Sequence, residues 1–158
     1  MSSRDNHAPR DTSTGKVNEA DIEQFLTENC EGSVYPQAEV GTQFDTDKTH
    51  IVDVLLGGKA HKKKKKAKRW ISEHQGGDLI SLKYQKVEGT AEEKIPFEFI
   101  KLQNAIDKYK YNRAIIVLCG DGGWTLKKTY LNPVNHQKFK LIAPDVTITD
   151  EENFRATV

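Results

Sequence analysis

The sequence predicts an α/β fold, in which a mixed β-sheet of four or five strands is flanked by α-helices. Residues 79–85 alternate apolar and polar side chains, as a half-buried strand does, and residues 114–119 form the continuous apolar run typical of a central strand. Between these segments, five apolar residues recur at the spacing of one helical face: Ile95, Phe99, Leu102, Ile106 and Tyr109. Strand, helix and strand in this order favour a parallel crossover.

The N-terminal segment is expected to differ from the rest of the chain. Residues 1–16 are polar and aperiodic, so their ordering entropy is not offset by burial and they are predicted to form a disordered tail. Asn18 is a suitable N-cap for a helix over 19–29, whose apolar side chains lie on one face. At 158 residues the chain fits one domain, which is predicted to span 17–158.

The remaining elements follow from breaks in the apolar pattern. Two extended segments, 38–44 and 50–56, are joined by a turn-like sequence and predict a β-hairpin. Pro96 is expected in the first turn of the long helix or just before it, because proline is costly inside a helix. Residues 139–142 are expected to form a last strand, and 150–155 a short terminal helix.

Composition restricts the class of protein. The formal net charge is +1, yet eight of the eleven residues from 59 to 69 are Lys or Arg, so the charge is local. The two cysteines are too few for a disulfide framework and lie in no zinc-binding pattern. The sequence has no signal-peptide pattern and no run near the roughly 18 apolar residues of a membrane span. A cytoplasmic protein without membrane contact is therefore expected.

Two charged residues stand on strands that are otherwise apolar. Asp53 lies within the run 51–56, where a carboxylate needs a cation, a metal or backbone donors. A structural ion pair with Lys83 is one explanation, and a divalent metal site is the other. Lys83 lies on the polar face of strand 79–85, where it could orient water or stabilise phosphate charge, with Gln85 on the same side. The alternative is an edge-strand lysine that extends into solvent.

A lysine-rich loop is predicted at 59–70, between the strands that hold Asp53 and Lys83. Its cations could neutralise phosphates and give salt-sensitive DNA binding without sequence preference. A solvated loop and a nuclear localisation signal are the alternatives, and the position of the loop favours DNA. The predicted DNA-binding residues are Lys62, Lys63, Lys64, Lys65, Lys66, Lys68 and Arg69.

Together these segments resemble the PD-(D/E)xK nuclease superfamily. The resemblance covers about residues 18–124 and rests on Asp53, the strand Ile80-Ser81-Leu82-Lys83-Tyr84-Gln85, the segment 89–96 (GTAEEKIP) and the apolar strand from Ile115 to Gly120. It is closest to restriction-type endonucleases with an S-x-K-Y-Q strand followed by G-T-A-E-E-K. The implied fold is restriction-endonuclease-like, with a helix, a three-stranded meander, a helix and a strand.

The chain departs from the superfamily pattern at Ser81. Members of this superfamily usually carry Glu or Asp two residues before the lysine, and some take the missing carboxylate from the next helix. Glu93 or Glu92 is the first choice for this role and Glu98 the third, with Glu23 as a supporting acid. The resemblance implies a catalytic set with the following members: Asp53, Ser81, Lys83, Gln85 and Glu93. It implies Mg²⁺, with Mn²⁺ able to substitute, held by Asp53, Glu93, Glu92 and the Leu82 carbonyl.

The implied activity is metal-dependent hydrolysis of phosphodiester bonds in double-stranded DNA, by a site-specific, restriction-type endonuclease. Homodimerisation is expected because two active sites match the two-fold symmetry of a duplex target. Alternatives of the same fold are a homing or repair nuclease and a Holliday junction resolvase. A catalytically inactive DNA-binding protein is the alternative from another class, because Ser81 could mark a dead site.

Overall fold

The computed structural model describes residues 13–62, 69–84, 93–120 and 127–158. These residues form a seven-stranded mixed sheet in the order β3-β4-β1-β2-β5-β6-β7. The strands are β1 (Val34–Thr42), β2 (Thr49–Leu56), β3 (Ala60–Lys62), β4 (Trp70–Ser72), β5 (Asp78–Tyr84), β6 (Arg113–Cys119) and β7 (Val146–Asp150).

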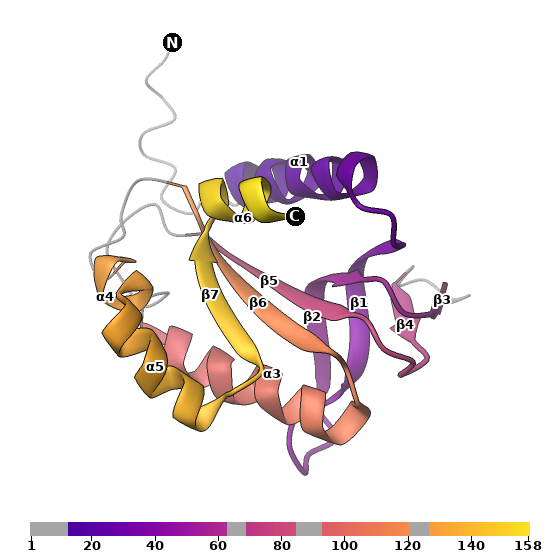
Figure 1. Cartoon of the computed structure of the whole chain (residues 1–158). Helices are drawn as coiled ribbons and strands as arrows, with labels where there is room; N and C mark the ends of the chain where they lie inside the picture. The colour runs from indigo at the N-terminus through magenta and orange to yellow at the C-terminus, as the bar shows by residue number, and fades with distance from the viewer. Residues whose placement is uncertain (1–12, 63–68, 85–92, 121–126) are drawn as a thin grey trace.

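Helices cover both faces of this sheet. They are α1 (Ser13–Asn29), α3 (Ile95–Tyr109), α4 (Lys127–Leu131), α5 (Pro133–Ile142) and α6 (Glu151–Thr157). α1 and α6 lie on one face, and α3, α4 and α5 lie on the other (Figure 1). The predicted α/β class, with a mixed sheet flanked by helices, is confirmed.

The strand directions define the edge at which a site can form. β5 pairs in parallel with β6, and β6 with β7, so the carboxyl ends of these three strands lie at the same edge. The crossover from β5 through α3 to β6 is therefore parallel, as predicted. β2 runs antiparallel to β5, which brings the first half of β2 toward the carboxyl end of β5.

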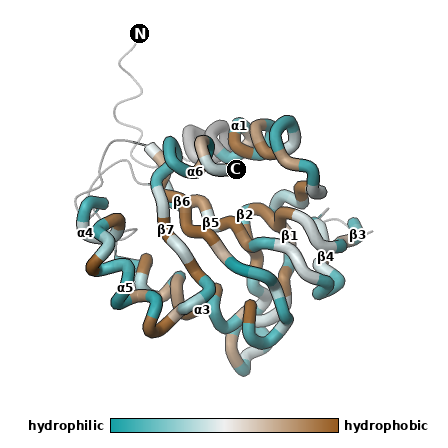
Figure 2. The backbone as a smooth tube through the Cα atoms, viewed as in Figure 1, coloured by the Kyte–Doolittle hydropathy of each residue, from teal (hydrophilic) through white to brown (hydrophobic). Residues whose placement is uncertain are grey.

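Two apolar clusters fix the helices on the sheet. The cluster beneath α3 contains Phe99 and Leu102 of the helix with Leu79 and Ile116 of the strands. The cluster beneath α1 and α6 joins side chains of both helices to the opposite sheet face: Ile22, Leu26, Val54, Ile80, Leu82, Val117 and Phe154. Figure 2 shows the hydrophobic segments concentrated along the central strands. α3 is thus held rigidly against β5 and β6, where its polar flank can serve a site.

Two sequence-based expectations were wrong. The sheet has seven strands within the described residues rather than four or five, because β3 and β4 are each three residues long and show no periodicity. Residues 139–142 belong to α5, which starts at Pro133 after an Asn132 N-cap, and the last strand is β7. β7 contributes two buried side chains, Val146 and Ile148, too few to distinguish it from a loop by pattern.

The first helix also differs from its prediction. α1 begins at Ser13 rather than after Asn18, so residues 13–16 are helical and not part of a tail. Once Ile22 and Leu26 anchor a helix on the sheet, each further residue adds a backbone hydrogen bond at low cost, which extends the helix toward its N-terminus. Residues 1–12 lie outside the described part of the chain.

The hairpin, the long helix and the terminal helix were predicted close to their observed positions. Pro96 occupies the first turn of α3. None of the helices formed by the described residues combines the length and the apolar composition needed to cross a lipid bilayer.

Candidate active site

The site is built around the point where β2 and β5 separate. The two strands pair at Leu56 with Asp78, at Leu55 with Leu79 and at Val54 with Ile80, and their pairing ends there. Beyond it, the Leu82 N–H donates a hydrogen bond to Asp53 Oδ2 at 2.7 Å. A backbone donor that no longer serves the ladder is thereby satisfied by a carboxylate. We call this place the β2–β5 fork.

Ser81, Lys83 and Glu98 converge beside the fork. The Ser81 hydroxyl donates to Glu98 Oε2 at 2.7 Å, and Lys83 Nζ lies 3.5 Å from Glu98 Oε1. Lys101 Nζ lies 3.2 Å from the same Oε1. The Glu98 side chain is 8% exposed, so this carboxylate is buried but has polar partners on both oxygens. Glu98, the third choice among the candidate acids, is therefore the one that contacts Ser81, the position where the superfamily usually carries its second acid.

Helical geometry explains why Glu98 reaches the sheet. Glu98 follows Ile95 by three residues and precedes Leu102 by four, and both of these side chains are buried beneath α3. Residues at these spacings share a helical face, so Glu98 points toward β5 rather than into solvent. This spacing is the sequence signal that would have ranked Glu98 above Glu92 and Glu93.

The electrostatics of Glu98 favour its ionised form. Burial alone would raise the pKa of its carboxyl group, but the charges of Lys83 and Lys101 and the hydrogen bonds from Ser81 and Lys101 outweigh burial and lower it. Glu98 is thus a buried, charged carboxylate, available as an oxygen ligand at neutral pH.

The pKa of the Asp53 carboxyl group is shifted in the opposite direction. Burial raises the pKa of its carboxyl group above the usual value, although the Leu82 N–H, Glu19 and the charge of Lys83 act in the other direction. Glu19 on α1 is a hydrogen-bonding partner of Asp53. Burial, and then the charge of Asp53, also raise the pKa of Glu23, one helical turn further along α1.

These groups fit a divalent cation. Mg²⁺ prefers one or two carboxylates completed by water and phosphate oxygens, and Asp53 interacts electrostatically with Glu98 at the fork. Across residues 13–62, 69–84, 93–120 and 127–158, no cluster of three or more His, Cys, Asp or Glu side chains forms a ready-made metal cage. An ion that keeps most of its water does not need such a cage.

The order of elements and the fork geometry agree with one known family. A family profile described as PD-(D/E)XK nuclease superfamily domain matches residues 10–157, almost the whole chain. The chain belongs to the PD-(D/E)XK nuclease superfamily. No curated protein and no solved structure matches it.

The residues predicted to match the superfamily's aspartate and lysine, Asp53 and Lys83, both lie at the β2–β5 fork. The predicted proximity of Asp53, Ser81 and Lys83 is seen at the fork. Glu93 is exposed just before α3, and no contact among the described residues links it to Ser81 or Lys83. Gln85 and Glu92 lie outside the described residues.

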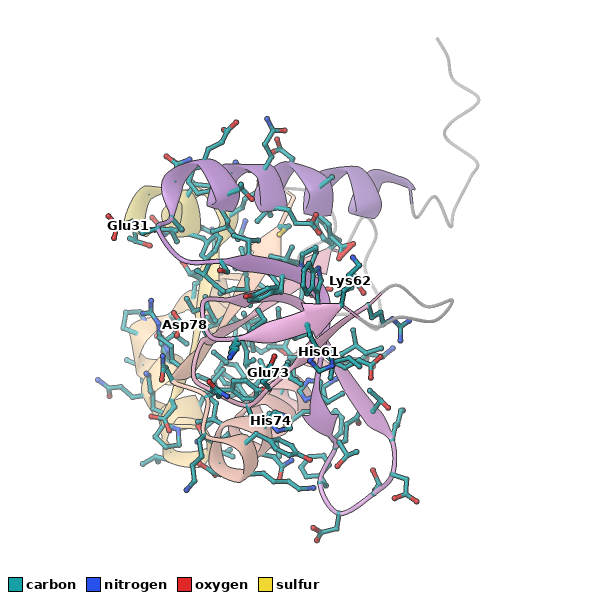
Figure 3. All side chains as sticks on the ribbon, turned by 90° about the vertical axis from the view of Figure 1, so that its right-hand side faces the viewer. Glu31, His61, Lys62, Glu73, His74 and Asp78 are labelled. Carbon is teal, nitrogen blue, oxygen red and sulfur yellow. The ribbon has the colours of Figure 1, made fainter. Side chains whose placement is uncertain are left out.

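The described members of the lysine-rich loop lie at the sheet edge formed by β3 and β4. Lys62 ends β3 and is exposed, with its ammonium 4.8 Å from the centre of the Trp70 ring. Arg69 is half-buried immediately before β4, while Lys63 to Lys66 and Lys68 lie outside the described residues. Figure 3 shows Lys62 near this edge, together with His61 and Glu73; His61 Nδ1 lies 3.5 Å from Glu73 Oε2.

Proposed function

We propose that this nuclease is a divalent-metal-dependent endonuclease that hydrolyses phosphodiester bonds of double-stranded DNA, with Mg²⁺ as the ion and a site-specific, restriction-type role. The observation that carries the proposal is the contact between Ser81 and Glu98. Through this contact the Glu98 carboxylate lies beside position 81, where the sequence lacks an acid, and its Oε1 is 3.5 Å from Lys83 Nζ. An inactive descendant would have no reason to keep a buried carboxylate there, since burial of charge is costly.

Each residue has a role that follows from its position. Asp53 and Glu98 would hold the metal, and the Leu82 carbonyl lies on the strand between their contacts. Bound there, the cation would supply Lewis-acid polarisation of the phosphate. The Lys83 ammonium is suited to orient an attacking water and to stabilise the charge that develops on the phosphate oxygens. Glu19 and Glu23 add negative charge on the α1 side and favour cation binding.

The sheet register supports a path for DNA. Lys62 pairs with Trp70, Trp70 with Ala38, and Ala38 with Val52, the residue before Asp53. Neighbouring strands are about 4.8 Å apart, so the backbone of Lys62 lies roughly 14 Å from β2 at the level of the site. That spacing lets a phosphate at the fork and another phosphate near Lys62 belong to one duplex. The lysine-rich loop is therefore proposed to grip DNA beside the site.

A homodimer is proposed because one such site cuts one strand, and two sites related by a two-fold axis cut both. The exposed apolar side chains of α5 are compatible with a contact between copies, since Leu141 is 87% and Ile142 58% exposed. Sedimentation of the free protein and of its complex with a duplex measures the stoichiometry directly.

The decisive test is cleavage of supercoiled plasmid with Mg²⁺, with Mn²⁺ and with EDTA, followed by sequencing of the product ends. Wild type is expected to cut with either ion and not with EDTA. Asp53→Asn and Lys83→Met are expected to abolish cleavage while DNA binding is retained and the melting temperature is not lowered. Lys138→Met, an exposed lysine on α5, is the charge-matched control.

The outcome also separates the alternatives. Uniform ends at one sequence indicate a site-specific enzyme, and scattered ends or selective cutting of branched DNA indicate a repair nuclease or a resolvase. A wild type that binds DNA but shows no metal-dependent cleavage, or whose cleavage is unaffected by Asp53→Asn and Lys83→Met, would reject the catalytic role in favour of a DNA-binding protein.

A further inference from the structure

The Glu98 cluster carries more positive than negative charge. The ammonium groups of Lys83 and Lys101 both lie near one oxygen, Oε1, at 3.5 Å and 3.2 Å. The other oxygen accepts the hydrogen bond from Ser81, which is neutral. Together, the two ammonium groups and the one carboxylate that both contact carry a net charge of +1 in a partly buried place, and the charge of Lys83 also acts on the carboxyl group of Asp53. Such a surplus is expensive unless an anion completes the cluster.

Lys101 lies at the border between the core and solvent. It follows Ile100, which is 40% exposed, and precedes Leu102, which is buried. Its own side chain is 20% exposed, against 8% for Glu98. The Lys101 ammonium can therefore contact the buried Glu98 carboxylate and also bind a ligand that approaches from solvent, because the lysine side chain is amphipathic.

The environment of His50, on β2, shows the same excess of positive charge. This imidazole lies near the start of β2, is 1% exposed, and its Nδ1 has no hydrogen-bond partner among the residues described. Its pKa is lowered to about 4, first by burial and next by the charge of Lys101, whose effect exceeds the opposing effect of Glu98. The charge of Lys83 lowers it further. The lysines thus outweigh the carboxylate at this point.

We propose that Lys101 is a second phosphate-binding residue of the site, which contacts a non-bridging phosphate oxygen of the DNA beside Lys83. The inference rests on the proposed function, because a cation that takes the Glu98 carboxylate releases both ammonium groups. Phosphate oxygens are then the nearest new anions. A lysine that merely neutralises Glu98 would instead lose its role when that charge is removed.

The test removes the Glu98 charge and needs neither metal nor cleavage. Duplex binding is measured in EDTA over a range of salt concentrations for Glu98→Gln, for Glu98→Gln with Lys101→Met, and for Glu98→Gln with Lys138→Met. Loss of one phosphate contact reduces the slope of log affinity against log salt by about 0.9. We expect this reduction with Lys101→Met, and roughly 10-fold weaker binding at low salt. Lys138→Met should leave the slope unchanged.

Equal slopes for Glu98→Gln with and without Lys101→Met would overturn the proposal and leave Lys101 as a counter-ion of Glu98. If Glu98→Gln fails to fold, the same comparison is made between wild type and Lys101→Met with Ca²⁺, under conditions where the DNA stays intact. The two proposals fail separately. A slope change in a protein that never cleaves supports the phosphate contact and rejects the nuclease, whereas active cleavage with equal slopes does the reverse.

Discussion

The Ser81 hydroxyl donates a 2.7 Å hydrogen bond to Glu98 Oε2, and this contact joins the strand that lacks an acid to the helix that supplies one. The functional atoms of positions 81 and 98 are therefore neighbours, although the residues are 17 apart in sequence. A carboxylate on either residue could serve nearly the same point in the fork. The position of the acid in the sequence can change while its position in space is kept.

This contact predicts that the two residues can be exchanged. Glu98→Ser alone should reduce cleavage by more than roughly 100-fold, because loss of a metal ligand costs at least as much as loss of an outer-shell partner. Adding Ser81→Glu should restore a measurable part of the rate. Single-turnover rates at saturating Mg²⁺ make the comparison. A double variant no faster than Glu98→Ser would show that the two positions are not equivalent.

A second prediction ranks the candidate glutamates. Glu98→Gln should abolish metal-dependent cleavage, and Glu93→Gln should keep a rate within about 2-fold of wild type, because Glu93 is exposed and has no contact with the fork among the described residues. Both substitutions remove one negative charge and keep the side-chain shape, so each controls for the other. Strong loss with Glu93→Gln alone would return the metal-binding role to Glu93.

A third prediction concerns the anchoring of α3. Phe99 is 1% exposed and stacks on Phe139 with ring centroids 4.6 Å apart. Phe99→Ala should lower the free energy of unfolding by about 3–5 kcal/mol. It should also slow cleavage below the melting temperature, because Glu98 is its neighbour on the helix. Phe97→Ala is the matched control, since that ring is 51% exposed and its loss should cost less than about 1 kcal/mol. Denaturant unfolding measures both.

The sequence predicted the elements with long, regular periodicity and the residues carried by a motif. The strand over 79–85 and the helix that contains Phe99 and Leu102 were found because many side chains repeat at one period. Asp53 and Lys83 were found because their strands read clearly and the resemblance links them. β3 and β4 were missed because three residues show no period.

Glu98 was placed third among the candidate acids for a different reason. Its role depends on the rotation of α3 on β5, and the sequence left the start of that helix uncertain by one turn around Pro96. The spacing of Glu98 from Ile95 and Leu102 places it on the buried face of α3. Which strand residues that face meets depends on how the helix packs on the sheet, and this is a tertiary property. The same is true of Lys101 and His50, which belong to no motif and meet the site only through packing.

The last prediction concerns Asp53 and pH. Burial raises the pKa of this carboxyl group above its ordinary value of 3.8, so the folded protein binds the proton more tightly than the unfolded chain does. The associated stability is present below that value and is lost as pH rises through the folded-state pKa. Asp53→Asn removes this loss while still accepting the Leu82 N–H. It should stabilise the protein at pH 7, and the gain should vanish as pH falls below the folded-state pKa of Asp53. Mg²⁺ should stabilise wild type, by about 2.7 kcal/mol at 100 times its dissociation constant, and not Asp53→Asn. Thermal unfolding across pH, with and without Mg²⁺, measures both effects. A metal ligand that is costly to bury without its cation should make the protein more stable when its charge is removed. A variant that is less stable than wild type at pH 7 would therefore contradict a metal-binding role for Asp53. A variant that still responds fully to Mg²⁺ would contradict it as well.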